Sequence, residues 1–217
     1  MMTRGICLAL ALLVVQGCAL LEVRERSRAS LDEGNAVRMD KEGWVELAGV
    51  RVAVTASNER LRAAMIGPAP MVPLPIFPLP PSWLETHRPA ASFWIDVALD
   101  PEGEGFVFDP SQVRLRFGQD GDRRAVRMIG PAALADLRSR RHSGRLCGYD
   151  PRRASAVVGP VAITQLSCVS LEFDVAPPTV DTAFALGIEG LANAGAPVVV
   201  PTLVFSRDHR WILTPLP

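Results

Sequence analysis

The chain has 217 residues, with 23 basic and 23 acidic side chains and an apolar content of 48%. This apolar content indicates a globular protein rather than a disordered one, and the length suffices for one sizeable core or two small ones. The even charge balance argues against a nucleic-acid-binding protein, which would favour a basic surface. The 19 prolines and 17 glycines interrupt the chain every few residues, which disfavours long helices and favours short strands joined by turns.

The N-terminal segment has the pattern of an export signal. Arg4 is the only charged residue before Glu22, and residues 6–15 are all apolar. Ten apolar residues match the hydrophobic region of a signal peptide and fall short of the roughly 20 that a membrane-spanning helix needs. We therefore expect residues 1–17 to be a signal peptide that is removed on export.

A cysteine motif ends this segment. Val15-Gln16-Gly17-Cys18 has an aliphatic residue, a tolerant position, a small residue and then cysteine, and it resembles the lipobox of bacterial lipoproteins. The resemblance implies that the Cys18 thiol receives diacylglycerol, that cleavage occurs before it, and that the new amino group is acylated, for example with palmitate. Ala19 in place of aspartate resembles the default for sorting to the outer membrane, with the protein facing the periplasm. An ordinary secretory signal with a chance cysteine is the open alternative.

The remaining cysteines form a candidate pair. Cys7 would leave with the signal peptide and Cys18 would carry lipid, so Cys147 and Cys168 remain. An even pair in an oxidising compartment predicts a disulfide, and its loop of about 20 residues would make it worth about 3 kcal/mol. Cys168 falls on the polar face of a predicted strand, so its partner should come from a crossing loop. Two free thiols, or a metal site shared with His142, are the alternatives.

The rest of the chain predicts a tether and one mainly β domain. Residues 18–36 are polar after their first positions and predict a lipid anchor with a tether, and residues 37–217 predict the folded domain. We expect roughly eight to ten strands, with turn signals at the spacing of a β-sandwich. The clearest alternation of apolar and polar residues covers 44–57 (with a break at Gly49), 93–99, 113–117 and 166–175.

Two further segments have distinct predictions. Residues 119–122 carry the Asp-Gly signal of a hairpin turn, and residues 130–137 predict a short helix with Pro131 at its first position. The segment 92–128 is similar to parts of small exported lipoproteins with an immunoglobulin-like fold. The resemblance implies an immunoglobulin-like β-sandwich with one short helix and a proline-rich loop.

That proline-rich insertion covers residues 67–82, where seven of the sixteen residues are proline. Such spacing forbids both a helix and a central strand. The segment could fold back over an open edge of the sandwich, or it could dock on an envelope protein or on the bilayer. The candidate partner contacts are its apolar side chains and the tryptophan that follows, namely Met71, Leu74, Ile76, Phe77, Leu79 and Trp83.

Charged clusters offer little support for a ligand site. The acidic residues Asp100, Glu102, Glu104 and Asp109 resemble a cation loop, but Ser111 stands where an EF-hand needs a carboxylate, so a solvated turn is the favoured interpretation. The basic residues of 138–145, with Arg152 and Arg153, could touch anionic head groups or polysaccharide, although a solvated helix end is favoured over that contact.

No catalytic or cofactor motif is present. The sequence lacks Gly-x-Ser-x-Gly, a Walker loop and a dinucleotide fingerprint, and the three histidines and the cysteines lack zinc-ligand spacing. We therefore expect no cofactor and no metal. The leading hypothesis is a non-enzymatic envelope lipoprotein that binds or supports another envelope component. The alternative is a periplasmic enzyme or small-ligand carrier that uses a cleft in the β domain.

Overall fold

The structure is a computed structural model, and the chain divides into two compact units. The first unit comprises Met1–Glu25, Arg60–Arg88 and His209–Pro217, and the second comprises Arg26–Glu59 and Pro89–Asp208. The residues that the structure describes are 19–32, 36–66, 85–87, 92–118, 121–133, 147 and 156–215.

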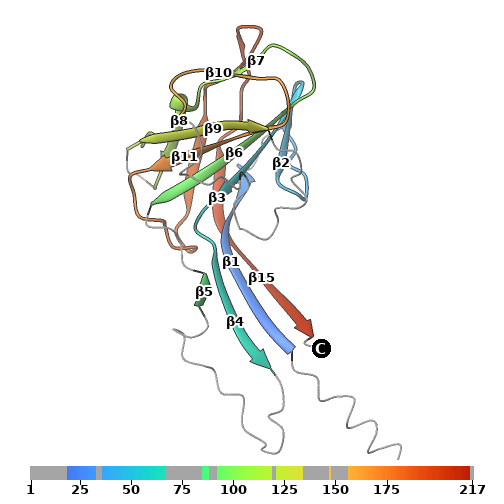
Figure 1. Ribbon diagram of the computed structural model, residues 1–217, viewed down its shortest axis with the longest axis vertical. Coiled ribbons are helices and arrows are strands. Elements are labelled where there is room, and N and C mark those ends of the chain that lie inside the picture. Colours follow the sequence, from blue (N-terminus) through green and yellow to red (C-terminus); the bar gives the residue numbers. More distant parts are fainter. Residues whose placement is uncertain are drawn as a thin grey trace, which may run out of the picture. The chain divides into compact units, whose positions relative to one another are not determined.

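Antiparallel strands form three sheets (Figure 1). The five-stranded sheet has the order β2 (Trp44–Leu47), β3 (Val50–Ala56), β6 (Phe93–Pro101), β11 (Ser167–Phe173), β9 (Arg127–Ala133). The four-stranded sheet has the order β10 (Val161–Ile163), β7 (Phe106–Phe108), β13 (Leu191–Asn193), β14 (Ala196–Pro197). The six-stranded sheet has the order β5 (Glu85–His87), β4 (Arg60–Ile66), β1 (Ala19–Leu31), β15 (Leu203–Pro215), β12 (Phe184–Ile188), β8 (Val113–Arg116).

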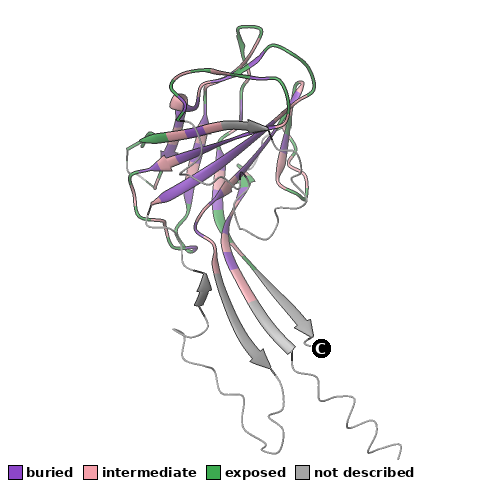
Figure 2. Cartoon of the chain, in the orientation of Figure 1, coloured by how far each residue is buried: buried purple, intermediate pink, exposed green. Residues whose placement is uncertain are grey.

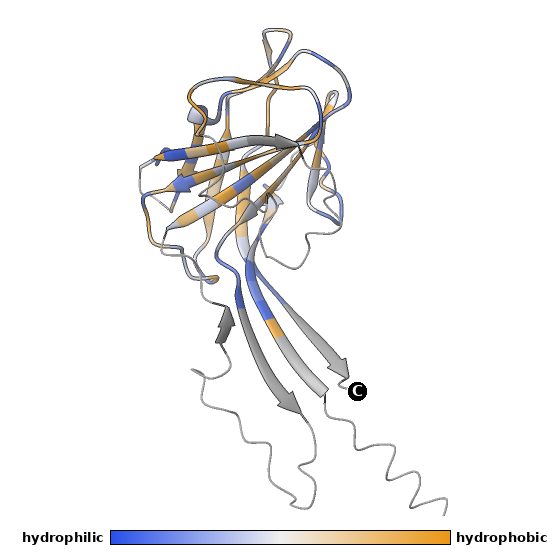
Figure 3. Ribbon diagram, viewed as in Figure 1, coloured by the Kyte–Doolittle hydropathy of each residue, from blue (hydrophilic) through white to orange (hydrophobic). Residues whose placement is uncertain are grey.

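The central strands β6 and β11 of the second unit are buried over most of their length (Figure 2), and apolar residues predominate along them (Figure 3). In β6, the apolar residues at every second position from Phe93 to Leu99 are completely buried in the main core. In β3 and β11 the same alternation buries valine, leucine and phenylalanine. This is the pattern that the sequence predicted, and the predicted break at Gly49 separates β2 from β3, with Leu47 paired to Val50.

An aromatic cluster forms the centre of the core. The Phe184 ring stacks on Phe205 with 4.5 Å between ring centroids, and it meets the Phe93 ring edge-on at 5.5 Å. Core residues come from all three sheets. A buried apolar layer shared between antiparallel sheets is consistent with a β-sandwich.

Strand β1 corrects the predicted tether over residues 18–36, because Ala19–Leu31 form a strand inside the six-stranded sheet. Its buried positions in the second unit include Ser27, which is 3% exposed. The Ser27 N–H donates to Asn58 Oδ1 at 3.2 Å, and Asn58 Nδ2 donates to Ser27 Oγ at 2.8 Å. Ser27 can therefore face inward in this strand, because the side chain of Asn58 satisfies its hydrogen bonds.

The predicted helix at residues 130–137 is also corrected. Residues 130–133 of the predicted helix belong to β9, and residues 134–137 lie outside the described part. Because β9 is at the edge of its sheet, it tolerates Pro131. Among the described residues the single helix is the 3-10 turn η1 (Pro110–Gln112). The predicted hairpin turn at 119–122 lies partly outside the described residues, which omit 119 and 120. On either side of it the chain is antiparallel at the Leu115–Arg123 bridge, while β9 belongs to a different sheet from β8.

Candidate functional site

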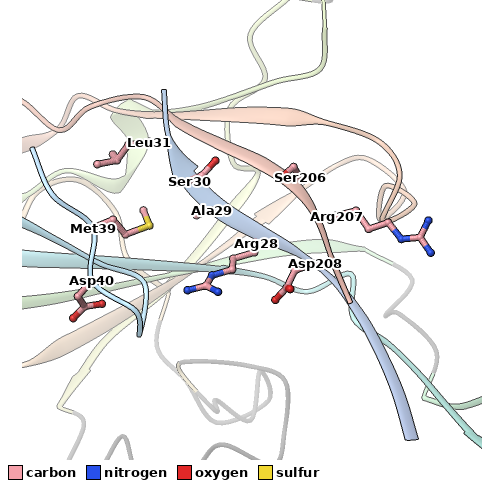
Figure 4. Close-up of a pocket in the computed structure, with 9 residues that line it drawn as sticks. All are labelled: Arg28, Ala29, Ser30, Leu31, Met39, Asp40, Ser206, Arg207 and Asp208. Carbon is pink, nitrogen blue, oxygen red and sulfur yellow. The ribbon is translucent and has the colours of Figure 1, made fainter. Parts of the chain in front are cut away.

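A cleft of about 340 Å³ lies between β1, the segment before β2, and β15 (Figure 4). All of its lining residues belong to the second unit. The sequence analysis singled out none of them, because it expected a tether where β1 forms one wall. The lining residues are Arg28, Ala29, Ser30, Leu31, Met39, Asp40, Ser206, Arg207 and Asp208.

The charged groups on one side of the cleft bond to the protein's own backbone. Arg28 Nη2 donates to the Lys41 carbonyl at 2.7 Å. Asp40 Oδ1 accepts from the Trp44 N–H at 2.8 Å. These bonds fix the segment that precedes β2.

The charged groups on the β15 side form ion pairs. Arg207 Nη1 lies 2.8 Å from Asp181 Oδ1, and Asp208 Oδ2 lies 3.6 Å from Arg26 Nε. The cleft thus presents both signs of charge, and each of its four charged side chains already has a partner within the chain.

The buried carboxylate of Asp96 lies on the face of β6 that points away from the main core. Asp96 is 2% exposed, and it accepts hydrogen bonds from Ser170 Oγ at 2.5 Å and from the Cys147 N–H at 3.0 Å. Burying a carboxylate is costly unless hydrogen bonds compensate. Asp96 therefore fixes Cys147 against the sheet. Sequence reasoning missed this site, although an aspartate within an otherwise apolar strand is a usable signal.

The predicted disulfide joins Cys147 and Cys168, whose Cα atoms are 5.5 Å apart. Both cysteines are buried and form a small second cluster with Ala53 and Ala98. Cys168 points away from the main core, as the strand pattern predicted, and Cys147 reaches it from the connection between β9 and β10. The disulfide thus attaches this connection to the outer face of the five-stranded sheet.

Of the acidic residues near the β6–β7 turn, Asp100 forms an ion pair and two others are exposed. Asp100 forms an ion pair with Arg51, and Glu102 and Glu104 are exposed. Within the described part of the chain, no three histidine, cysteine, aspartate or glutamate side chains gather as metal ligands.

Asp109 caps the 3-10 turn η1. Its Oδ1 accepts from the Ser111 N–H at 3.0 Å and from Ser111 Oγ at 2.6 Å. Burial alone would raise the pKa of Asp109, but these hydrogen bonds, with smaller contributions from Gln112 and Arg114, outweigh it and hold the pKa below its ordinary value. The carboxylate therefore stabilises the turn in its charged form.

Several predicted sites lie outside the described residues. These are the lipidation site Cys18, the basic residues of 138–145 with Arg152 and Arg153, and His142. The candidate partner contacts Met71, Leu74, Ile76, Phe77, Leu79 and Trp83 lie outside them as well. The helical residues that the structure describes do not include a segment long and apolar enough to span a membrane.

Comparison of the chain with protein-family models, with curated proteins and with solved structures found no match. Any functional assignment therefore rests on the residues and their geometry.

Proposed function

We propose that the chain is a lipid-anchored protein of the cell envelope, in the outer membrane and facing the periplasm, with a non-enzymatic binding or supporting role. The observation that carries this proposal is the lipobox-like Val15–Cys18, followed at once by the first residue of β1, Ala19. Cleavage before Cys18 would leave the whole described fold intact and would put the acylated residue next to the start of a strand.

The packing of the second unit supports a role without chemistry. Its core is filled by completely buried apolar side chains, and the charged groups of the cleft bond to their own chain. We also propose that the antiparallel sheets around this core form an immunoglobulin-like sandwich. Folds of that kind commonly present loops and edges to partners.

Labelling of the acyl group tests the anchor. The full chain is expressed in a Gram-negative host with radioactive palmitate, beside Cys18→Ser and, as the matched control, Cys7→Ser. We expect label and detergent-phase partitioning in the wild type and in Cys7→Ser, because residue 7 leaves with the signal. Cys18→Ser should lose both. Label that persists in Cys18→Ser, or an unlabelled wild type, would overturn the proposal.

A partner contact through residues 67–82 remains a prediction. Its test is deletion of residues 68–81, followed by cross-linking in the envelope and identification of co-purified proteins. We expect the deleted chain to keep its thermal unfolding midpoint and to lose specific cross-links. Unchanged cross-links in a folded variant would remove this segment from the binding role.

The cleft favours one second candidate, a carrier of a small polar ligand. Its volume of about 340 Å³ is within the range of small-molecule sites, and Arg28 and Asp40 supply opposite charges. Thermal-shift screening with zwitterionic and anionic compounds tests this candidate. A shift in the wild type that is absent in Arg28→Ala would support it, and the absence of any shift would count against it.

A further inference from the structure

One end of the sheet in the first unit is defined by the register of β1 and β4. These strands are antiparallel, with Ala19 opposite Ile66 and Glu25 opposite Arg60. Strand β1 therefore begins at the level where β4 ends. The residue before Ala19 is Cys18, so the proposed lipid would be attached one residue beyond this end of the ladder.

The C-terminal strand ends on the same side. Strand β15 is the other neighbour of β1, and Ser30 Oγ donates to the Val204 carbonyl while Arg26 pairs with Asp208. Residue numbers thus increase along β1 as they decrease along β15, which makes the two strands antiparallel. The end of β15 at Pro215 therefore lies toward the start of β1.

Toward this end each strand has a run of consecutive apolar residues, which in β15 is followed by Thr214 and Pro215. Residues 19–21 read Ala-Leu-Leu, residues 63–66 read Ala-Ala-Met-Ile, and residues 211–213 read Trp-Ile-Leu. In these runs the residues at successive strand positions, which belong to opposite faces of a sheet, are all apolar in the sequence. A sheet with a face in water would alternate instead.

Between β1 and β4 the change from apolar to charged residues falls at nearly the same level. Leu21 lies opposite Ala64, and one or two pairs farther along Glu22 and Arg62 begin the charged part of their strands. In β15 the charged run ends at Arg210, directly before Trp211. A boundary shared across strands is expected where a sheet passes from water into an apolar medium.

We propose that this strand end, formed by residues 19–21, 63–66 and 211–213, inserts into the lipid surface as a second membrane contact beside the acyl chains. Three strand residues extend about 10 Å, which matches the depth of the head-group and acyl boundary and falls well short of the roughly 30 Å hydrocarbon core. The occupant is lipid rather than another protein, because the proposed acyl chains start from the adjoining residue, Cys18. The inference thus builds on the proposed lipid anchor.

Quenching of tryptophan fluorescence by brominated lipids tests the insertion. The purified full chain is mixed with phosphatidylcholine vesicles whose acyl chains carry bromine at a shallow or a deep position. The fluorescence that comes from Trp211 is the difference between the emission of the wild type and that of Trp211→Phe. The matched control is Trp94→Phe, which removes a tryptophan of the second unit that is 6% exposed.

We expect shallow bromines to quench the Trp211 contribution strongly, deep bromines to quench it less, and neither to affect the Trp94 contribution. In Leu20→Asp, the charged residue should lower vesicle binding of a non-acylated Cys18→Ser chain about tenfold. Circular dichroism confirms that each variant is folded.

Two results would overturn the proposal. One is a Trp211 contribution that the vesicles leave unquenched. The other is a dimer in light scattering that Leu20→Asp converts to a monomer, since that would show a second copy covering the strand end. The quenching is measured whether or not Cys18 carries lipid, so a failure of palmitate labelling and a failure of insertion are distinguishable.

Discussion

Removal of the Cys147–Cys168 disulfide should cost a large part of the protein's stability. The two cysteines are 21 residues apart in sequence, and the loop-entropy relation gives a contribution of about 3 kcal/mol for a loop of that length. A typical domain has a free energy of unfolding of roughly 5–15 kcal/mol. The disulfide would therefore supply between about a fifth and three fifths of such a free energy of unfolding.

The packing around the bond adds a smaller amount. Cys147 and Cys168 are 2% and 0% exposed, and they contact Ala53 and Ala98. The double variant Cys147→Ala/Cys168→Ala removes the bond and two buried sulfur atoms, so its loss should exceed that of the reduced wild type by on the order of 1 kcal/mol. The difference between the two samples isolates the packing contribution.

Urea unfolding at pH 7, followed by circular dichroism with and without reductant, measures both quantities. Reductant should lower the unfolding midpoint of the wild type and leave that of the double variant unchanged, which is the control. A reduced wild type that unfolds at the same urea concentration as the oxidised protein would refute the reasoning. In that case the hydrogen bond from Cys147 to Asp96, rather than the disulfide, would hold the segment in place.

Three further changes have expected outcomes that unfolding experiments can check. Phe184→Ala should lower the free energy of unfolding by about 3–5 kcal/mol, because its ring packs against three other buried or half-buried phenylalanines, while Val158→Ala, at a residue 94% exposed, should change it little. Gly190→Ala should destabilise the protein strongly, since a Cβ there would lie 2.1 Å from the Asp109 carbonyl oxygen, whereas Gly103→Ala has nothing within 4 Å and should be near neutral. Asp109→Asn should make the free energy of unfolding less sensitive to acid. Because folding lowers the pKa of Asp109, its carboxylate stabilises the folded protein above the ordinary aspartate pKa, and this stabilisation is lost as the pH falls through the pKa of the folded state.

Local patterning explains which strands could be predicted from the sequence. In β3, β6, β8 and β11 a large apolar residue recurs at every second position, so the period of two is visible within a few residues. Strand β1 lacks this signal because its inward positions include Glu25 and Ser27. The hydrogen bonds that make Ser27 tolerable come from Asn58, 31 residues away, and no local window contains both partners.

The helix at residues 130–137 was wrongly predicted because its glycine-proline pair is compatible with two kinds of structure. Glycine followed by proline suits the start of a helix, but it also suits an irregular edge strand. Gly130 has a φ of +125°, and β9 pairs with β11 through a register shift between Cys168 and Ser170. The choice between helix and strand therefore depended on a neighbouring strand that is distant in sequence.

The candidate sites also differ in whether the sequence alone could predict them. The disulfide could be predicted by counting cysteines and assigning a compartment, which needs no coordinates. The hydrogen bonds of Asp96 could not, because Ser170 and Cys147 are 74 and 51 residues away from it. The cleft likewise joins β1 to β15, which are the first and last strands of the chain.

The pairing of the first strand with the last also affects how the chain can fold. The hydroxyl of Ser30 bonds to a carbonyl 174 residues later, and β15 separates β1 from β12 in the six-stranded sheet. Contacts of such sequence separation slow folding, since a long loop must close before they form. The sheet stays open until β15 has left the ribosome, so a chain truncated before Leu203 would expose unpaired edges on both β1 and β12.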